Sequence, residues 1–393
     1  MKTLSAKFNI VTPMFLGDAE QKATSIRPPS IKGALRFWWR ALNWKNAIED
    51  RSEDEALVWL HREESRIFGH AADESNTQSG RGGQGVFVLA VKHGKLQTYA
   101  KGSEPFGKSI GIEYLMGQGL WHFKNKLTRN AIKEGQDFTV SIAFKPTVSD
   151  ADITSVMDAF CLFGMLGGLG SRARHGFGSI ALAQIETDGI ELPCKLDEVN
   201  TSDGYASTIQ RLIGRMANVS QPPISAFSSD SVVSIVCEKS KISQILSYVG
   251  DEMQLYRSYG RNGQVGGKAA EQNFCDDHDN VRNMSLNRPP RRSIFGLPHN
   301  YFFSSDKMQV DVNAEYGHVD ARRPSPLLLH IHPVGNAFVA VHVLLKSLFL
   351  PKDASIVVKN KKTKKKMEFS PDVDYGVIEQ YLKRFKNAQR IVG

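Results

Sequence analysis

Hydrophobic and polar residues alternate in several short segments of the first half of the chain, as they do in half-buried β-strands. The clearest case is segment 3–11, in which Leu4, Ala6, Phe8 and Ile10 share one face. Further strands are predicted over residues 86–91, 138–144 and 180–185.

Between these strands the apolar residues recur every three or four positions, which is typical of amphipathic helices. The first such run extends from Ile31 to Leu42, and Ser30, which follows two prolines, is its expected N-cap. Two more helices are predicted, over 53–68 and 152–163. The resulting order, β-α-β-β-α-β, is that of the ferredoxin-like arrangement shared with RNA-recognition folds.

The second half of the chain shows patterns of the same kind. It follows segment 219–231, VSQPPISAFSSDS, which has the composition of a linker. Strands are predicted over 232–237, 327–331 and 338–345, helices over 242–256 and 377–385, and a hairpin with a lysine-rich tip over 356–369. We therefore expect an α+β protein of two ferredoxin-like (RRM-like) domains with insertions, over 1–220 and 221–393. Segment 92–136 has no clear period and is assigned to no element.

Composition indicates a folded protein of the cell interior. Of 393 residues, 41% are hydrophobic and 23% charged, which is typical of a globular chain. No apolar run approaches the ~20 residues that a membrane helix needs. The alternating N-terminus does not resemble a signal peptide. The four cysteines, Cys161, Cys194, Cys237 and Cys275, form no C-x-x-C pair, so we expect no disulfide framework or cysteine zinc site and a cytoplasmic location.

The charge balance favours a polyanionic partner. Fifty Lys and Arg against 41 Asp and Glu give a net charge of +9. In the first predicted helix, Lys32, Arg36 and Arg40 fall four residues apart and form a basic stripe, with Trp39 at its edge. Such a face could bind phosphates and stack a base. The alternative is an ordinary solvated helix face.

A glycine-rich loop, GMLGGLGSRARHGFG, occupies residues 164–178. It follows a predicted helix and precedes a strand, which is the reverse of the order that a dinucleotide-binding fingerprint requires. Its small residues allow a ligand to approach the backbone, and it carries Arg172, Arg174 and His175. Backbone N–H groups and the two guanidinium groups suit a sugar-phosphate chain. The alternative is a tight packing turn with solvated arginines.

Three segments carry a resemblance to a known family. They are TPMFLGDAEQKATSIRPPSIKGALRFWWRAL at 12–42, the glycine-rich loop at 164–178, and FGLP at 295–298 followed by RRPSP at 322–326. Together they resemble the RAMP subunits of the type III-B CRISPR (Cmr) effector complex, the first of these subunits in particular. The resemblance implies a non-catalytic RNA-binding subunit near the 3′ end of the guide RNA that helps to capture single-stranded target RNA. Its implied partners are guide RNA, target RNA and other Cmr RAMP subunits, with no membrane.

On this hypothesis, cations of the first helix and of the glycine-rich loop converge on one RNA-binding groove. The residues expected to contact RNA are Arg27, Lys32, Arg36, Trp39, Arg40, Arg172, Arg174, His175, Arg261, Lys268, Arg291 and Arg292. The lysine-rich segment 359–366 is either a further RNA contact or a solvated turn.

One alternative function is a P-loop ATPase, because GSEPFGKS at 102–109 has the Walker A spacing. Pro105 removes a backbone donor, however, and Glu104 places a negative charge where the phosphate would lie. The segment that follows, with three glycines, makes a poor helix. A Walker B imitation at 245–252 lies within a helical pattern. The sequence therefore does not favour this alternative.

A second alternative is a metal-independent, guide-processing endoribonuclease, for which His70, His122 or His175 could act as general base. None has a visible catalytic partner. His330 and His332 share a strand face that is expected to face solvent, without a third metal ligand, and 275–279 is expected to be an acidic loop. We expect no catalytic site, metal or cofactor. A third alternative is a scaffold whose basic surface contacts acidic subunits.

Overall fold

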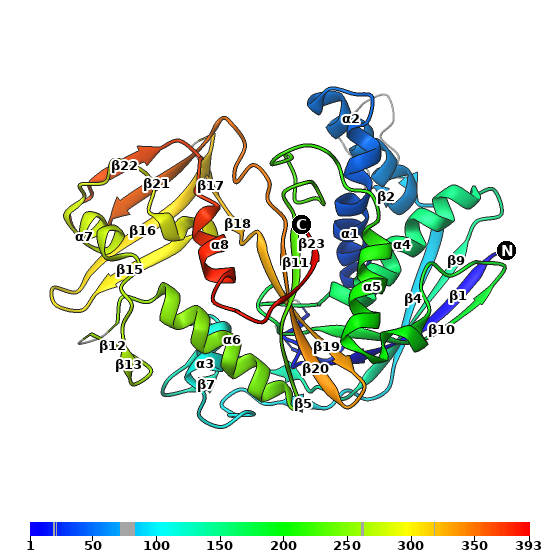
Figure 1. Ribbon diagram of the computed structural model, residues 1–393, viewed down its shortest axis with the longest axis horizontal. Helices are drawn as coiled ribbons and strands as arrows, with labels where there is room; N and C mark the ends of the chain where they lie inside the picture. The colour runs from blue at the N-terminus through cyan, green and yellow to red at the C-terminus, as the bar shows by residue number, and fades with distance from the viewer. Residues whose placement is uncertain (19, 21, 71–82, 261–262, 318) are drawn as a thin grey trace.

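The computed structural model describes residues 1–393 apart from 19, 21, 71–82, 261–262 and 318. Figure 1 shows two mixed α/β halves side by side, with the N-terminal half on the right of the view. The α+β class expected from the sequence is therefore confirmed. No helix among the described residues is long and apolar enough to cross a membrane.

A four-stranded antiparallel sheet forms the centre of the first half. Its strands are β1 (Thr3–Ile10), β4 (Phe87–His93), β9 (Asp137–Phe144) and β10 (Ile180–Asp188), in the spatial order β10-β1-β9-β4. The helices are α1 (Pro28–Ile48) and α2 (Glu53–Phe68) between β1 and β4, and α4 (Asp150–Leu166) between β9 and β10. The chain path follows the predicted β-α-β-β-α-β order.

The alternation in β1 separates the helix-covered face of this sheet from its open face. Phe8 is fully buried, stacks on Phe138 at 5.4 Å and meets Phe160 of α4 edge-on at 5.3 Å, whereas Ser5 is exposed. Helix α1 begins at Pro28 with Arg27 as N-cap, so the prediction that Ser30 is the N-cap is wrong. A proline at the first helical position needs no N–H partner and already has a helical φ, so the helix starts there.

The second half contains a second path of this kind. Its elements are β11 (Val232–Lys239), α6 (Ile242–Arg257), β19 (Leu327–Val334), β20 (Ala337–Leu344), α8 (Gly376–Leu382) and β23 (Gln389–Val392), with the sheet order β19-β20-β11-β23. Two insertions into this path form a five-stranded sheet of β15 (His299–Phe303), β16 (Met308–Tyr316), β17 (Val319–Ala321), β21 (Ala354–Asn360) and β22 (Lys366–Phe369). Strands β21 and β22 pair as the predicted hairpin.

Shorter elements complete the structure. In the first half they are β2 (Gly69–His70), β3 (Gly83–Gln84), β5 (Thr98–Tyr99), α3 (Ile110–Met116), β6 (Trp121–His122), β7 (Lys126–Leu127), β8 (Ala131–Ile132), η1 (Leu196–Asn200) and α5 (Ser202–Ile213). In the second half they are β12 (Gln264–Val265), β13 (Lys268–Ala269), α7 (Cys275–Asn283), η2 (Arg291–Phe295), β14 (Gly296–Leu297) and β18 (Arg323–Pro324). Helix α7 occupies the segment expected to be an acidic loop, so that expectation is wrong.

The two halves pack closely against each other. Segment 219–231 is not a free linker, because Phe227 is buried against Trp38 at 6.4 Å and its N–H donates to the carbonyl of Ala41. The unassigned insertion 92–136 contributes α3, which packs on α6. A Cβ on Gly250 would overlap the carbonyl of Gly111, so the two helices meet backbone to backbone.

Candidate nucleic-acid interface

The start of the chain and the glycine-rich loop form one hydrogen-bonded unit. The hydroxyl of Thr12 donates to the carbonyl of Gly176 at 2.7 Å and accepts the N–H of Ser179 at 2.9 Å. The N–H of Ser171 donates to the carbonyl of Phe15 at 3.0 Å. Gly178 has a φ of +63°, and a Cβ there would overlap the carbonyl of Leu169, so this position requires glycine.

The third motif segment closes over the other side of the loop. Strand β14 pairs with β18, which joins 295–298 to 322–326. Arg174 of the loop donates through Nη1 to the carbonyl of Ser325 at 2.7 Å, and its own carbonyl accepts the N–H of Leu329 at 2.9 Å. All three segments that carried the resemblance therefore meet in space.

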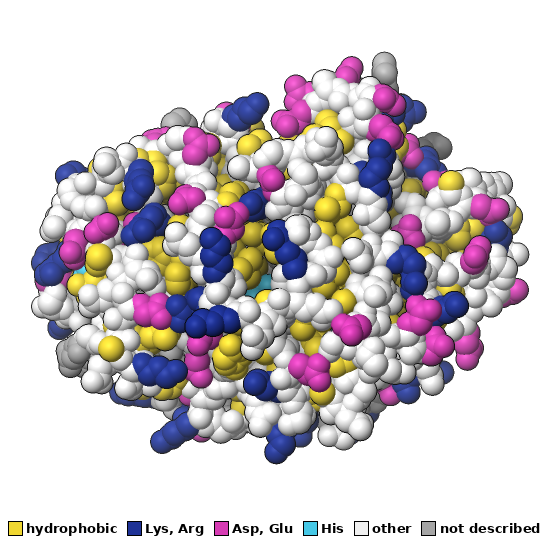
Figure 2. Space-filling view, viewed as in Figure 1, with side chains coloured by type: hydrophobic (Ala, Val, Ile, Leu, Met, Phe, Trp, Pro, Cys, Tyr) yellow, Lys and Arg dark blue, Asp and Glu magenta, His cyan; other side chains and the backbone are white. Residues whose placement is uncertain are grey.

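Between these segments lies an open groove of about 800 Å³. Its lining comes from 114–119, the glycine-rich loop, the end of α6, 295–300 and 322–325, so both halves contribute. Five arginines line it: Arg172, Arg174, Arg257, Arg322 and Arg323. No Asp or Glu is among the described residues that line it. In Figure 2, Lys and Arg side chains lie among Asp, Glu and hydrophobic side chains over the face that is drawn.

Arg172 gives this groove its clearest anion-binding character. Its backbone is left-handed, with a φ of +64°. Burial and the neighbouring guanidinium groups of Arg257 and Arg129 lower its pKa from the ordinary value. No carboxylate of the described residues lies within ion-pair distance of Arg172. The gathered positive charge therefore lacks a neutralising partner within the described chain, and an anion would supply one.

Two other groove arginines are held in place by the protein. Burial, with Arg323 beside it, lowers the pKa of Arg174 to about 10, and its guanidinium lies 5.1 Å from the ring centre of Phe37. Arg323 donates to the hydroxyl of Ser347 at 2.6 Å and to the carbonyl of Leu348 at 3.2 Å. These contacts fix the direction of both side chains along the groove wall.

His175 lines the groove but is not a cation. Burial, followed by the positive charges of Arg172 and Arg257, lowers its pKa to about 3, so its imidazole is neutral near pH 7. The arginines that attract an anion also repel a proton from this ring, so His175, a predicted RNA contact, would meet RNA as a neutral imidazole. A base with so low a pKa is also poorly matched to proton abstraction at neutral pH. His299 lines the same groove, and burial, followed by the positive charges of Arg292 and Arg257, lowers its pKa as well.

The basic stripe of α1 faces α2 and not this groove. Arg40 donates to Glu64 at 2.8 Å, and Arg36 reaches the same carboxylate at 3.4 Å and the carbonyl of Gly69. Glu64 is 7% exposed, so both arginines neutralise a buried charge. No residue of α1 is among the described residues lining the groove. The predicted convergence of first-helix and loop cations is therefore wrong, although Phe37 of α1 does contact Arg174.

Trp39 is 1% exposed and cannot stack on a base in this structure. Its Nε1 donates to the hydroxyl of Ser155 on α4 at 2.7 Å, and its ring meets Phe68 of α2 edge-on at 6.0 Å. The prediction of an exposed indole is wrong, because α1 is covered by α4 on one side and by α2 on another.

The other predicted contacts are spread over the molecule. Arg27 is exposed at the start of α1, Lys32 lies 5.6 Å from the ring centre of Phe87, and Lys268 is exposed on β13. Arg261 lies outside the described residues. Arg291 and Arg292 are engaged inside the second half, the first with the carbonyl of Asn273 and the second with the carbonyl of Arg257.

Sequence reasoning missed Arg257, Arg322 and Arg323 as site residues. Arg322 and Arg323 were part of a motif quoted for the resemblance, which was a usable signal. Arg257 is the last residue of α6, and its place on the groove depends on how the two halves pack. No local pattern could have identified it.

The structure also bears on the Walker-like segment. The strand before it, β5, has two residues, and Ser109 caps the seven-residue α3, accepting the N–H of Ile112 and donating to Ser247. A helix does form there, contrary to expectation. Its N-terminal turn packs against α6, and Glu104 pairs with Lys126 at 3.1 Å.

The strand histidines are core residues. His330 and His332 are 1% and 2% exposed, and His332 stacks on Tyr205 at 4.3 Å, so the expectation that they face solvent is wrong. Burial lowers the pKa of both. Within the described residues, no group of three or more His, Cys, Asp or Glu side chains is placed to hold a metal ion.

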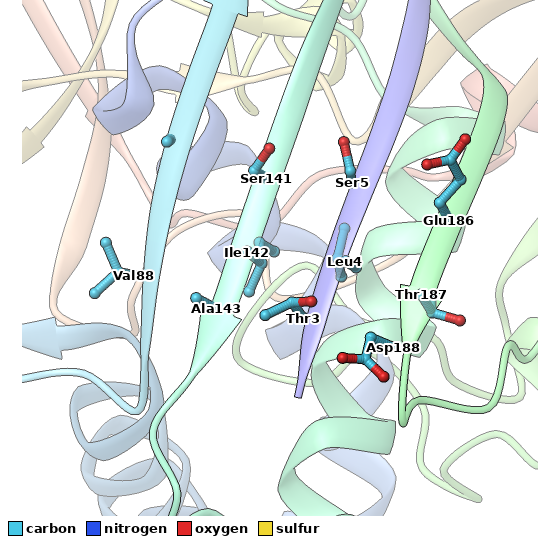
Figure 3. Close-up of a pocket in the computed structure, with 11 residues that line it drawn as sticks. Thr3, Leu4, Ser5, Val88, Ser141, Ile142, Ala143, Glu186, Thr187 and Asp188 are labelled. Carbon is cyan, nitrogen blue, oxygen red and sulfur yellow. The ribbon is translucent and has the colours of Figure 1, made fainter. Parts of the chain in front are cut away.

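The open face of the first sheet offers a second hollow, of about 490 Å³ (Figure 3). Small polar side chains such as Ser5 and Ser141 line it, together with Val88, Glu186 and Asp188. None of the described lining residues is aromatic or basic. RNA-recognition domains bind RNA on this sheet face through aromatic residues, so here the arginine groove is the better candidate.

Comparison with known proteins covers two of the three segments that carried the resemblance, 12–42 and 164–178. Residues 7–181 match the model of the RAMP superfamily. This region of the chain is therefore similar to the superfamily that the motifs of the sequence indicated.

Among individual relatives, the chain is similar to CRISPR system Cmr subunit Cmr1-2 of Pyrococcus furiosus. The two are 28% identical over 189 residues, which is 44% of this chain and 92% of the relative. The crystal structure of apo Cmr1 from Pyrococcus furiosus has a TM-score of 0.58 at 15% identity and covers 100% of this chain and 99% of its own. A chain in the cryo-EM structure of type III-B Cmr-beta bound to cognate target RNA has a TM-score of 0.52 at 10% identity, covering 98% and 99%. The fold is therefore shared over the whole chain.

Proposed function

We propose that this protein is an RNA-binding subunit of a type III-B CRISPR effector complex and that its arginine groove holds the sugar-phosphate backbone of RNA. Its partners are guide RNA, single-stranded target RNA and other RAMP subunits of the complex, in the cytoplasm. The relative named Cmr1-2 and the fold shared with a chain of a target-RNA-bound complex support this assignment.

The observation that carries the proposal is the composition of the groove. Five arginines from three separate segments line one hollow without a lining carboxylate, and Arg172 has other arginines as its charged neighbours. Guanidinium forks bind phosphate oxygens bidentately, and several phosphates in a row would neutralise them together. Arg27, Lys32 and Lys268 remain predicted contacts outside this groove. Arg261, which lies outside the described residues, also remains a predicted contact.

In the complex, we place the subunit towards the 3′ end of the guide RNA, where it helps to capture target RNA. This position rests on the motif resemblance. We further propose that each half is a ferredoxin-like RAMP domain, divided near residues 220 and 221. The support is that each half follows a β-α-β-β-α-β path, with its fourth, first, third and second strands side by side in the sheet.

We propose that the subunit is not itself a nuclease. The support comes from the two histidines on the groove. Their lowered pKa values keep both rings neutral near pH 7, so that neither is an imidazolium acid, and make both weak bases. In this role the protein supplies affinity and position, and cleavage of the target belongs to other subunits.

Binding of purified protein to labelled single-stranded RNA at 50 and 200 mM salt tests the proposal. Arg172→Ala and Arg322→Ala should each weaken binding and flatten the slope of log affinity against log salt by about 0.7. Arg62→Ala, an exposed arginine on α2, is the charge-matched control and should bind like the wild type. RNA binding that is unaffected by both groove variants would refute the proposal. Cleavage of repeat RNA without metal would favour the endoribonuclease instead.

A further inference from the structure

The insertion 92–136 presents one aromatic side chain to solvent. Phe123 lies at the turn of the β6–β7 hairpin and is 72% exposed. Figure 1 shows β7 beside α3, at the lower edge of the view. A single exposed Phe is common on protein surfaces, so its surroundings decide whether it serves as a contact.

The hairpin holds this ring in a defined place. Nδ1 of His122 accepts the backbone N–H groups of Lys124 and Asn125, both at 3.3 Å, which fixes the turn. Trp121 is 7% exposed and anchors the hairpin in the core. Lys126 pairs with Glu104 at 3.1 Å on the neighbouring loop. Because the backbone of the turn is already fixed, binding through this ring would not have to order the hairpin.

The surroundings of the ring select the partner. Nζ of Lys124 lies 5.6 Å from the ring centre of Phe123, and Nζ of Lys126 lies 5.4 Å from that of Trp121. An aromatic face with adjacent cations suits a nucleobase that is attached to a phosphate backbone. A purely apolar protein partner would leave the ammonium group of Lys124 poorly solvated, whereas that of Lys126 is already paired with Glu104.

The hairpin is continuous with the arginine groove. Gln118 and Gly119 line the groove, and the hydroxyl of Thr128 donates to the carbonyl of Gly119 at 2.9 Å, which ties the base of the hairpin to the groove rim. Phe123 is four positions after Gly119, so their Cα atoms are at most ~14 Å apart. An RNA strand that leaves the groove at this rim would come within reach of the ring.

We propose that Phe123 stacks on an unpaired base of the RNA strand whose phosphates lie in the arginine groove. This inference rests on the proposed function and extends it, because it defines where the strand leaves the groove. The base is recognised by its π-face, so the contact is tolerant of sequence.

Affinity for single-stranded RNA at two salt concentrations separates stacking from charge. Phe123→Ala should weaken binding about 5- to 100-fold with an unchanged salt slope, and Phe123→Trp should restore it. Tyr316→Ala, which removes a half-exposed ring from the five-stranded sheet, is the matched control and should bind like the wild type.

A second measurement locates the base. RNAs with one abasic site at successive positions should bind wild-type protein normally except at the stacked position, and Phe123→Ala should be insensitive to that same position. Wild-type RNA affinity of Phe123→Ala would overturn the inference. So would a loss of affinity in Phe123→Ala that is accompanied by a flattened salt slope and is not restored in Phe123→Trp. If Arg172→Ala still lowers affinity in these cases, the groove proposal stands and the stacking proposal alone fails.

Discussion

Thr12 and Gly176 are 164 residues apart in the chain, yet the hydroxyl of one donates to the carbonyl of the other at 2.7 Å in the protein interior. The same hydroxyl accepts the N–H of Ser179. This one side chain therefore connects the N-terminal motif to the end of the glycine-rich loop, and through the loop to the groove that Arg172 and Arg174 line.

Thr12→Ala should lower the free energy of unfolding by about 1–3 kcal/mol, because it leaves a buried carbonyl and a buried N–H without their partner. Urea unfolding followed by circular dichroism measures the change. Thr147→Ala, at an exposed loop position, is the control and should stay within about 0.5 kcal/mol of the wild type. Equal stability of Thr12→Ala and the control would show that the loop does not depend on this contact.

Helix α3 of the insertion and helix α6 meet at Gly111 and Gly250, where a Cβ on Gly250 would overlap the carbonyl of Gly111. Gly250→Ala should therefore lower stability by about 1–3 kcal/mol, since neither backbone can move without repacking the contact between the halves. Gly33→Ala is a well-matched control, because Gly33 lies in α1 with nothing within 4 Å of its added Cβ.

Thermal unfolding distinguishes Gly250→Ala from Gly33→Ala, because the two substitutions should change the stability in opposite directions. In the helix of Gly33, alanine should raise stability by up to about 1 kcal/mol. If Gly250→Ala raises stability as well, α3 and α6 do not pack backbone to backbone, and the role of the insertion has to be reconsidered.

Local pattern predicted the elements well because strands and helices are decided largely by residue period. The alternation of Leu4, Ala6, Phe8 and Ile10 corresponds directly to the buried face of β1. The second half was predicted on the same grounds, and its β21–β22 hairpin was found where the lysine-rich turn indicated it.

The site could be predicted less well, because its residues depend on packing between elements. A helical wheel placed Trp39 beside Lys32 at the edge of a basic stripe, but it could not show that α2 and α4 both cover α1. Nor could it show that Glu64, on the next helix, would neutralise Arg36 and Arg40. The motif resemblance did identify the glycine-rich loop, whose Arg172 and Arg174 line the groove. A motif singles out residues by their sequence alone and needs no knowledge of packing.

Arg40→Ala should lower stability by about 1–2 kcal/mol and leave RNA binding unchanged. The variant removes the closest ion-pair partner of the buried Glu64 carboxylate. Because the Arg40 side chain is about one-third exposed, solvent screens part of the lost interaction energy. Chemical denaturation and the RNA titrations at two salt concentrations measure both effects, with Arg62→Ala again as control. A flattened slope of log RNA affinity against log salt for Arg40→Ala would show that helix α1 does contact RNA.

Buried histidines should make the protein lose stability in mild acid. Burial lowers the pKa of His342 to about 4 and that of His330 to about 3, below an unfolded value of about 6.5. The unfolded chain therefore binds protons first, and each histidine should remove up to about 1.4 kcal/mol of stability per pH unit as the pH falls from 6.5 towards 4. Above pH 6.5 these groups are neutral in both states and contribute no slope.

Urea unfolding of wild type and His342→Gln between pH 7.5 and 4.5 tests this. Glutamine has a carbonyl and an amide in place of the ring nitrogens that lie near the Leu328 carbonyl and the Tyr381 hydroxyl, but it does not titrate. The variant should be less stable than the wild type at pH 7.5. Below pH 6.5 its free energy of unfolding should fall less steeply with pH, by a slope that corresponds to about one bound proton. His61→Gln, at an exposed position of α2, should keep the wild-type slope. An identical slope in wild type and His342→Gln would mean that His342 titrates normally and is therefore not buried as described, because desolvation is what keeps its imidazole neutral.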